Sequence, residues 1–351
     1  MKKKQFRHFS SIICLCLSFM LFSCATTVDV RLTRPAQLDL NGAKTIAVLP
    51  VKPYAYYKDY NASLGKQILI NSFYQIFDIR DADEQLAIDS LRTQIERGLL
   101  DSPYIKLVSS DAVVNARQKG LINPADVYLT GEVTYFNVDD DRTEEKKLVK
   151  AAKGDEKAEY KIVKYWKRSV HMNFRYQVVD SSTDRVISFE EVRMYNYSSK
   201  YESKHSLPSV YSLLESDIRS ASRKILKELQ PYVVIKSIKL LETKTKDKEL
   251  KARMKAASEL AENNKIQESS EQFQQIYMET GLVEAGYNAA ILQEALGNLS
   301  VAERMMENVY NNNPDNRVAK GLADIQYEIN QANRLKNQIK NSDSDSEDLD
   351  L

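Results

Sequence analysis

The chain has 351 residues, 43% of them hydrophobic, and a formal net charge of +1 from 50 Lys and Arg against 49 Asp and Glu. This hydrophobic content excludes disorder over most of the length, and the near-neutral charge gives no electrostatic case for nucleic-acid binding. The length is enough for two domains, each with its own apolar core.

The first residues have the pattern of a bacterial lipoprotein signal. Basic residues at Lys2, Lys3, Lys4 and Arg7 precede an uncharged, largely apolar run that ends in Ser23 and Cys24. The run is shorter than the roughly 20 apolar residues that a membrane-spanning helix needs. We therefore expect a signal peptide over residues 1–23, cleaved between Ser23 and Cys24. An ordinary cleaved signal peptide and an uncleaved anchor are the two alternatives.

The resemblance to lipoprotein signals implies a membrane attachment. In such proteins the cysteine at the position of Cys24 is acylated, typically with palmitate, and becomes the first residue of the mature chain. Ala25 follows it instead of an aspartate, which resembles outer-membrane sorting, so we expect an outer-membrane lipoprotein facing the periplasm. Cys14 and Cys16 leave with the signal, so no disulfide can form within the mature chain.

The segment after the signal shows a change from irregular to periodic sequence. Residues 24–40 contain no sustained periodicity and include Pro35, so they are predicted to be an extended tether. The apolar, β-branched run Thr45–Val51 is typical of a strand covered on both faces. The next predicted element is a helix over Asp83–Leu99, with an apolar stripe at Leu86, Leu91, Ile95 and Leu99. It is followed by a strand over Tyr104–Val108 and by a helix over Ser110–Lys119 that ends at Gly120.

Long alternating segments follow. A half-buried strand is predicted over Asp126–Val138, and the charged residues 139–157 are expected to form a solvated loop. Alternation resumes at Tyr160, turns at residues 181–184 and ends near Tyr197. A helix over Ser209–Leu229, stopped by Pro231, precedes a last strand over Tyr232–Leu240. Residues 41–240 are thus predicted to form an α+β domain, a mixed sheet with flanking helices.

Two short motifs in this domain carry a resemblance. The strand Thr45–Val51 and the segment Ala125–Val133 resemble the opening and later strands of the curli-secretion lipoprotein superfamily. Relatives of that kind insert hairpins into the outer membrane, which requires about ten residues of apolar alternation on a lipid-facing strand. Here Lys164 and Arg168 interrupt that face. The resemblance therefore implies the fold and not the pore.

Residues 241–339 contain a helical pattern that repeats at a spacing of 33, as between Ala256 and Ala289. The pattern resembles tetratricopeptide repeats, with Arg317–Ile339 as a capping helix and residues 340–351 as an acidic tail. Gln293 stands where the repeats prefer an aromatic residue or leucine, and a plain bundle of helical hairpins is the alternative. The residues expected to pack the helices are Ala256, Ala257, Phe273, Ala289, Ala290, Ala302, Met306 and Pro314.

The sequence contains no catalytic, cofactor-binding or metal-binding set. His171 and His205 are the only histidines that remain after the signal, and the ten glycines are dispersed, so no phosphate-cradling loop is predicted. The acidic run Asp139–Asp141 and the acidic tail are best interpreted as solvated charge. We therefore expect a non-enzymatic protein with no cofactor and no metal.

These observations lead to two hypotheses of function. The first is a lipid-anchored envelope interaction or scaffold protein whose repeats hold a protein or peptide partner in their concave face. The second is an oligomeric outer-membrane secretion or assembly subunit, in which the partner is another copy of the chain. Tyrosines near Tyr195, Tyr197 and Tyr201 suit an interface. An enzyme acting on cell-wall glycans is a third hypothesis that no motif supports. The whole chain resembles a group of bacterial lipoproteins, and that resemblance implies a fold and no activity.

Overall fold

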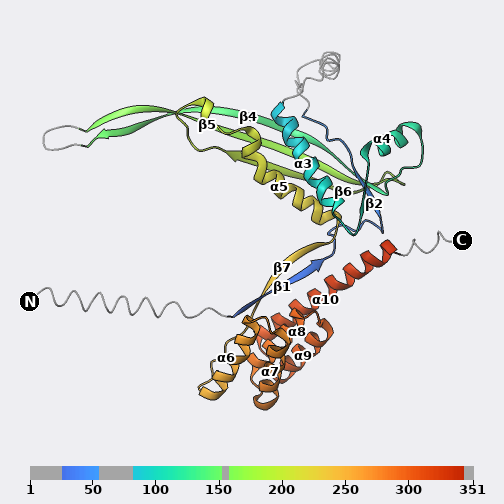
Figure 1. Ribbon diagram of the computed structural model, residues 1–351, viewed down its shortest axis with the longest axis vertical. Helices are drawn as coiled ribbons and strands as arrows, with labels where there is room; N and C mark the ends of the chain where they lie inside the picture. Colours follow the sequence, from blue (N-terminus) through green and yellow to red (C-terminus); the bar gives the residue numbers. More distant parts are fainter. Residues whose placement is uncertain (1–25, 55–81, 152–157, 344–351) are drawn as a thin grey trace, which may run out of the picture. The chain divides into compact units, whose positions relative to one another are not determined.

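The computed structural model describes residues 26–54, 82–151 and 158–343 (Figure 1). The chain divides into two compact units. The sheet unit comprises Pro35–Tyr232 with Asn337–Leu351, and the helical unit comprises Met1–Arg34 with Val233–Lys336. The structure is mixed α+β, as predicted. Ser23, Cys24 and the end of the acidic tail lie outside the described residues.

The sheet unit contains a five-stranded sheet in the order β3-β2-β4-β5-β6. Strand β2 pairs in parallel with both of its neighbours, whereas β4, β5 and β6 form an antiparallel meander. The strands are β2 (Thr45–Val48), β3 (Lys106–Val108), β4 (Val127–Lys150), β5 (Glu159–Asp180) and β6 (Val186–Tyr197).

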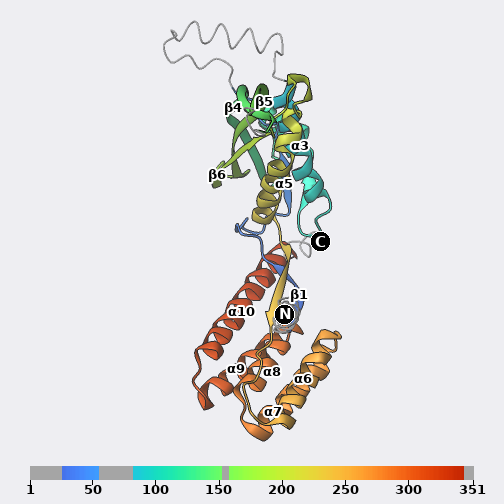
Figure 2. The ribbon, with the colours of Figure 1, turned by 90° about the vertical axis from the view of Figure 1, so that its left-hand side faces the viewer.

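Helices α3 (Ala82–Leu100) and α5 (Val210–Leu229) lie side by side on one face of this sheet (Figures 1 and 2). Helix α3 buries the predicted apolar stripe against the sheet, except that Leu86 is 50% exposed, and α5 likewise buries one apolar face. The two helices approach closely at Gly98, where an added Cβ atom would lie 2.3 Å from a methyl carbon of Leu226. A side chain at this position would therefore require Leu226 to move.

The other face of the sheet is covered at one end by α4 (Ser110–Lys119). Val113 on this helix packs with Ala47, Tyr128 and Val179. Gly120 ends the helix in the left-handed conformation, with φ of 63°, as the sequence predicts. Beyond α4, no helix in the described part of the chain packs on this face.

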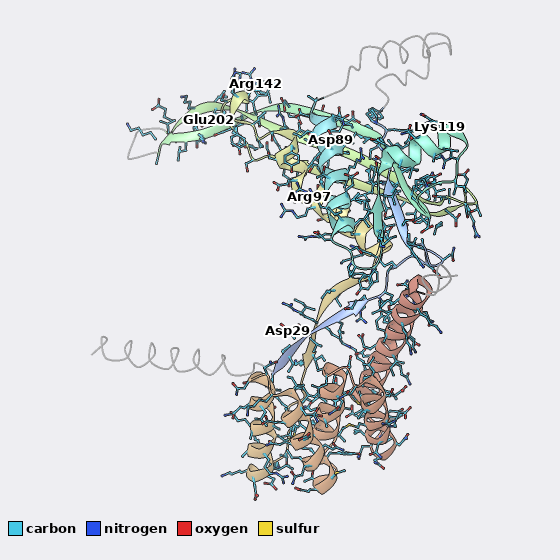
Figure 3. The ribbon with its side chains drawn as sticks, turned by 45° about the vertical axis from the view of Figure 1, so that its right-hand side comes forward. Asp29, Asp89, Arg97, Lys119, Arg142 and Glu202 are labelled. Atoms are coloured by element: carbon cyan, nitrogen blue, oxygen red, sulfur yellow. The ribbon has the colours of Figure 1, made fainter. Side chains whose placement is uncertain are left out.

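The prediction of a solvated loop over residues 139–157 is wrong for the described part of this segment, which is strand as far as Lys150. Strands β4 and β5 continue as a paired hairpin to Lys150 and from Glu159, well beyond α3 and α5 (Figure 1). Opposite charges face each other across the pair: Asp140 Oδ1 lies 2.7 Å from Arg168 Nε. Arg142, labelled near Glu202 in Figure 3, lies over the ring of Trp166. The charged residues that suggested a solvated loop in the sequence form cross-strand pairs in the structure.

The predicted tether at 24–40 is also wrong over its described part. Residues Thr27–Arg34 form strand β1, which pairs with β7 (Tyr232–Lys239) in a separate two-stranded sheet. Ser237 Oγ donates a 2.6 Å hydrogen bond to Asp29, which Figure 3 labels on β1. The last strand thus pairs with the amino-terminal segment instead of extending the main sheet. The boundary predicted at residue 240 falls inside the helical unit.

Five helices complete the helical unit in the described part of the chain. They form two consecutive pairs and a longer final helix, which extends beyond the predicted Ile339. Asn264 and Gly297 adopt positive φ at the turns between paired helices, a conformation that asparagine and glycine tolerate. The helices are α6 (Lys248–Glu262), α7 (Ile266–Thr280), α8 (Val283–Ala295), α9 (Leu299–Asn312) and α10 (Asn316–Asp343).

Candidate partner-binding surfaces

Most of the residues predicted to pack the repeats lie in the core of the helical unit. Ala256 is exposed on α6, and Pro314 is exposed in the turn before α10. A helix places neighbouring residues on different faces, so Ala257 enters the core and Ala256 faces outward. The buried residues of the set are Ala257, Phe273, Ala289, Ala290, Ala302 and Met306.

Gln293, which departs from the repeat pattern, has a structural role. Its Nε2 donates to Ser270 Oγ at 2.8 Å, and its Oε1 accepts from Asn298 Nδ2 at 2.9 Å. Ser270 Oγ also donates to the carbonyl of Ala289 at 3.0 Å. This chain of bonds joins the two helical pairs through a buried polar contact where an apolar residue would make only van der Waals contacts.

One face of the helical unit, formed by side chains of α6, α8 and α10, is covered by the chain itself. We call β1, β7 and their flanking residues Thr26, Leu240 and Leu241 the ribbon. Val28, Ile238 and Leu240 of the ribbon are buried in the core of the helical unit. Asn288 on α8 accepts from the backbone N–H of Leu241 at 2.7 Å and donates to its carbonyl at 2.9 Å. The ribbon therefore covers this face of the helices, and binding of a partner peptide by the repeats stays a prediction.

Charged side chains also join the ribbon to the helices. Lys236 on β7 contacts Glu294 on α8 and lies 3.0 Å from Glu328 on α10. Arg34 on β1 forms a two-point contact with Glu328, one bond of which is 2.7 Å long. Both glutamates are almost fully buried, with 1% and 5% of their surface exposed. We call these four residues the charge cluster.

The two glutamates of the charge cluster have opposite pKa shifts. Burial raises the pKa of Glu294, and its bond to Lys236 only partly offsets this. Burial acts in the same direction on Glu328, but hydrogen bonds from Arg34 and Lys236 outweigh it, and its pKa lies below the ordinary value. Glu294 Oε2 has no hydrogen-bond partner among the described residues. Glu328 is therefore the carboxylate that balances the two partly buried cations.

A groove remains open on the helical unit between α7 and α9. It has a volume of about 280 Å³ and is lined by apolar side chains, including Met305 and Val301. Met278 at its edge is 75% exposed. Flexible methionine side chains suit contact with varied apolar partners.

The sheet unit carries a row of aromatic rings on the face opposite α3 and α5. Tyr135 on β4 lies with its ring 4.8 Å from that of His171 on β5, which in turn lies 5.8 Å from Tyr195 on β6. Tyr197 extends the row beyond Tyr195. Tyr54, which also packs against the core on the α3 and α5 side, lies 6.0 Å from Tyr135 at the other end. We call these five residues the aromatic row.

The aromatic row is open to solvent. Tyr195 and Tyr197 are 61% and 56% exposed. Met194 and Asn196, which alternate with them along β6, are buried and partly buried on the other face of the strand. Lys167 Nζ lies 3.8 Å from the ring centre of Tyr197 and adds a cation at the edge. Exposed aromatic patches of this kind mark surfaces that bind other molecules.

A broad cleft lies at the amino-terminal ends of β2 and β4. It is lined by Arg117, Asp126 and Asp184 among others and has a volume of about 790 Å³. Asp126 accepts hydrogen bonds from the backbone of Lys44 and Thr45, both at 2.8 Å, and Arg117 lies 2.9 Å from Asp184. Asp126 is thus bonded to the backbone of β2 and its preceding residue, and Arg117 is paired with Asp184.

The residues considered for chemistry in the sequence lie apart. His171 belongs to the aromatic row, whereas His205 lies in a short 3₁₀ turn, Lys204–Ser206. A hydrogen bond from Arg168 holds the pKa of Asp140 below its ordinary value. In the described part of the chain no three His, Cys, Asp or Glu side chains gather where they could hold a metal. Among the same residues no helix is long and apolar enough to cross a membrane.

The residues that fix the ribbon were missed from the sequence. Val28, Val30 and Leu32 alternate with polar residues in β1, and this period-two pattern was a usable signal for a strand. Asn288 and Glu328 carried no such signal, because a polar residue on a helix is normally solvent-facing.

Known proteins resemble this chain only distantly. No protein-family model matches it, and no curated protein matches it. Among solved structures it is similar to the PelC dodecamer from Paraburkholderia phytofirmans, at 16% identity, covering 58% of this chain and 98% of that chain with a TM-score of 0.23. It is also similar to lipoprotein GNA1162 from Neisseria meningitidis, at 12% identity, covering 52% and 97% with a TM-score of 0.20. These likenesses assign neither a family nor an activity.

Replacement of Asn288 tests the docking of the ribbon. Asn288→Ala removes both partners of the Leu241 backbone and is expected to lower the free energy of unfolding by about 2–4 kcal/mol, since each buried unsatisfied group costs roughly 1–3 kcal/mol. Urea unfolding followed by far-UV circular dichroism measures this. The exposed Asn312→Ala is the control, and a loss no larger than its own would show that the Asn288 bonds do not hold the ribbon.

The two glutamates of the charge cluster are expected to differ. Glu328→Gln leaves Arg34 and Lys236 with one carboxylate and should cost on the order of 3–5 kcal/mol, whereas Glu294→Gln should cost less than about 1 kcal/mol. Because the pKa of Glu328 is depressed, its contribution is present above the unfolded value near ~4.3 and is lost as the pH falls through the folded value. Unfolding free energies measured between neutral and acid pH should therefore converge for wild type and Glu328→Gln. Equal losses for the two variants would contradict this assignment.

Proposed function

We propose that the protein is a lipid-anchored, non-enzymatic scaffold of the bacterial cell envelope that binds a protein partner through the aromatic row. The acyl chains on Cys24 would hold it at the periplasmic face of the outer membrane. The helical pairs, which we interpret as tetratricopeptide-like, would serve as a fixed body, because the ribbon fills the face that such repeats offer to peptides.

The aromatic row is the observation that carries this proposal. A sheet with one face covered by α3 and α5 normally exposes polar residues on the other face. Here Tyr135, Tyr195 and Tyr197 are exposed, and ring contacts join them through His171 across three strands. Tyrosine is well suited to an interface, since its ring buries apolar area and its hydroxyl still forms hydrogen bonds.

The membrane attachment is tested by replacing the acylated residue. Cys24→Ser is expected to remove acylation and to leave the chain as an unprocessed precursor, which its uncleaved signal holds at the inner membrane instead of the outer membrane. Intact-mass measurement and fractionation of cell envelopes check both. Ser23→Ala, which keeps a small residue before the cysteine, is the matched control and should be processed like the wild type. Processing and membrane association that survive Cys24→Ser would overturn the anchor.

The binding surface is tested by site-specific photocrosslinking in cells. A crosslinking side chain at Tyr195 is expected to trap one envelope protein, and Tyr197→Ser in the same chain should lower the yield several-fold. The same side chain at Met278, at the groove between α7 and α9, should trap none. Trapping at Met278 and not at Tyr195 would assign binding to the helical repeats instead of the sheet.

A second function, an oligomeric secretion or assembly subunit, is favoured by the same exposed sheet face, since identical chains could join through it. The crosslinking experiment separates the two. An adduct of twice the chain's mass, together with a large species in light scattering of detergent-extracted protein, would support the oligomer. An adduct with a different protein and a small species would support the scaffold.

A further inference from the structure

We infer that the helical unit is held directly against the lipid headgroups, at the carboxyl-terminal end of α6, and not on a flexible tether. This inference rests on the proposed acylation of Cys24. It adds an interaction surface to that proposal and identifies the partner as the phospholipid surface itself.

The docking of the ribbon begins at its first residues. Thr26 Oγ1 donates a 2.7 Å hydrogen bond to Glu262 at the end of α6, and the carbonyl of Thr26 accepts from Leu240 N–H at 2.9 Å. Val28, two residues later, is buried in the core of the helical unit. The amino-terminal segment is thus attached to the helices from Thr26 onward.

The distance between this point and the lipid is set by the chain. Cys24 lies two residues before Thr26, and a fully extended chain spans at most about 3.6 Å per residue, or roughly 7 Å here. The headgroup layers make up the difference between the hydrocarbon core of about 30 Å and the whole bilayer of about 40–45 Å, so each is on the order of 5–8 Å thick. A lipid on Cys24 therefore brings Thr26 to the headgroup boundary.

The connection between Cys24 and the helical unit could become longer only if β1 detached from β7 and from the helices, which the contacts of the ribbon oppose. Release of β1 would uncover Val28 and would leave Glu328 without Arg34 and next to Lys236 alone. The loss of a partner from a buried ion pair is strongly unfavourable. The surface beside Thr26, which includes Glu262, Asn263 and Lys239, is consequently the part of the helical unit that faces the membrane.

Fluorescence quenching from the lipid headgroups tests this placement. Asn263→Cys is exposed and next to Glu262, and in the acylated chain it is the only free thiol, because Cys24 is blocked. The purified lipoprotein, labelled at this thiol with an environment-insensitive fluorophore, is reconstituted into phosphatidylcholine–phosphatidylglycerol vesicles with and without nitroxide-labelled headgroups. We expect the nitroxide to reduce emission at least about two-fold, since the fluorophore lies within roughly 15 Å of the headgroups.

The matched control carries a Gly/Ser insertion of about 15 residues between Ala25 and Thr26, whose r.m.s. span is roughly 20 Å. The insertion leaves every ribbon contact in place and should restore most of the emission. Emission that is equally insensitive to nitroxide in both proteins would overturn the inference. Intact mass is measured on the same samples: acylated protein without quenching overturns only this inference, whereas absence of acyl chains overturns the proposed function with it.

Discussion

The helical unit depends on the burial of Glu328 between two cations that come from different strands. Arg34 belongs to β1 and Lys236 to β7, and only the paired ribbon brings both to the carboxylate on α10. A buried carboxylate without cations is energetically costly, so the charge of Glu328 on α10 is compensated only when the ribbon is in place. The ribbon in turn buries Val28, Ile238 and Leu240 on the helices, which a two-stranded sheet alone could not do. Each part therefore supplies what the other lacks.

This mutual dependence affects how the helical pairs are interpreted, because the ribbon binds them as an extended ligand would. Stacked helical repeats commonly offer their concave face to a peptide, and here Asn288 binds the backbone of Leu241 in both directions, as it would bind an extended ligand. The chain has used that face for its own assembly. In the described part of the chain, open apolar surface is found at the groove beside Met278 and, on the sheet unit, at the aromatic row, where tyrosines on β4 and β6 are exposed.

In the sheet unit, strands β4 and β5 extend beyond the helices that cover the sheet. Near α3 and α5 the inward residues of β4 and β5, such as Val133, Val170 and Met172, are buried. Farther out no core is available, and pairs such as Asp140 with Arg168 and Glu144 with Lys164 lie across the two strands. Cross-strand pairs of opposite charge stabilise a solvated hairpin modestly. Strand pairing continues there because the register set near the core carries on.

The sequence by itself determined the elements whose pattern is local. The stripes of α3 and α5, the left-handed end of α4 at Gly120 and the turns at Asn264 and Gly297 follow from periodicity and from the conformations that glycine and asparagine tolerate. The tertiary structure alone decided which strand pairs with β1, that 139–150 is a strand, and that the ribbon covers one face of the helices. The physical reason is that these outcomes depend on partners far away in the chain, such as Glu328 for Arg34 and Asn288 for Leu241. Their polar side chains carry no periodic signal of burial.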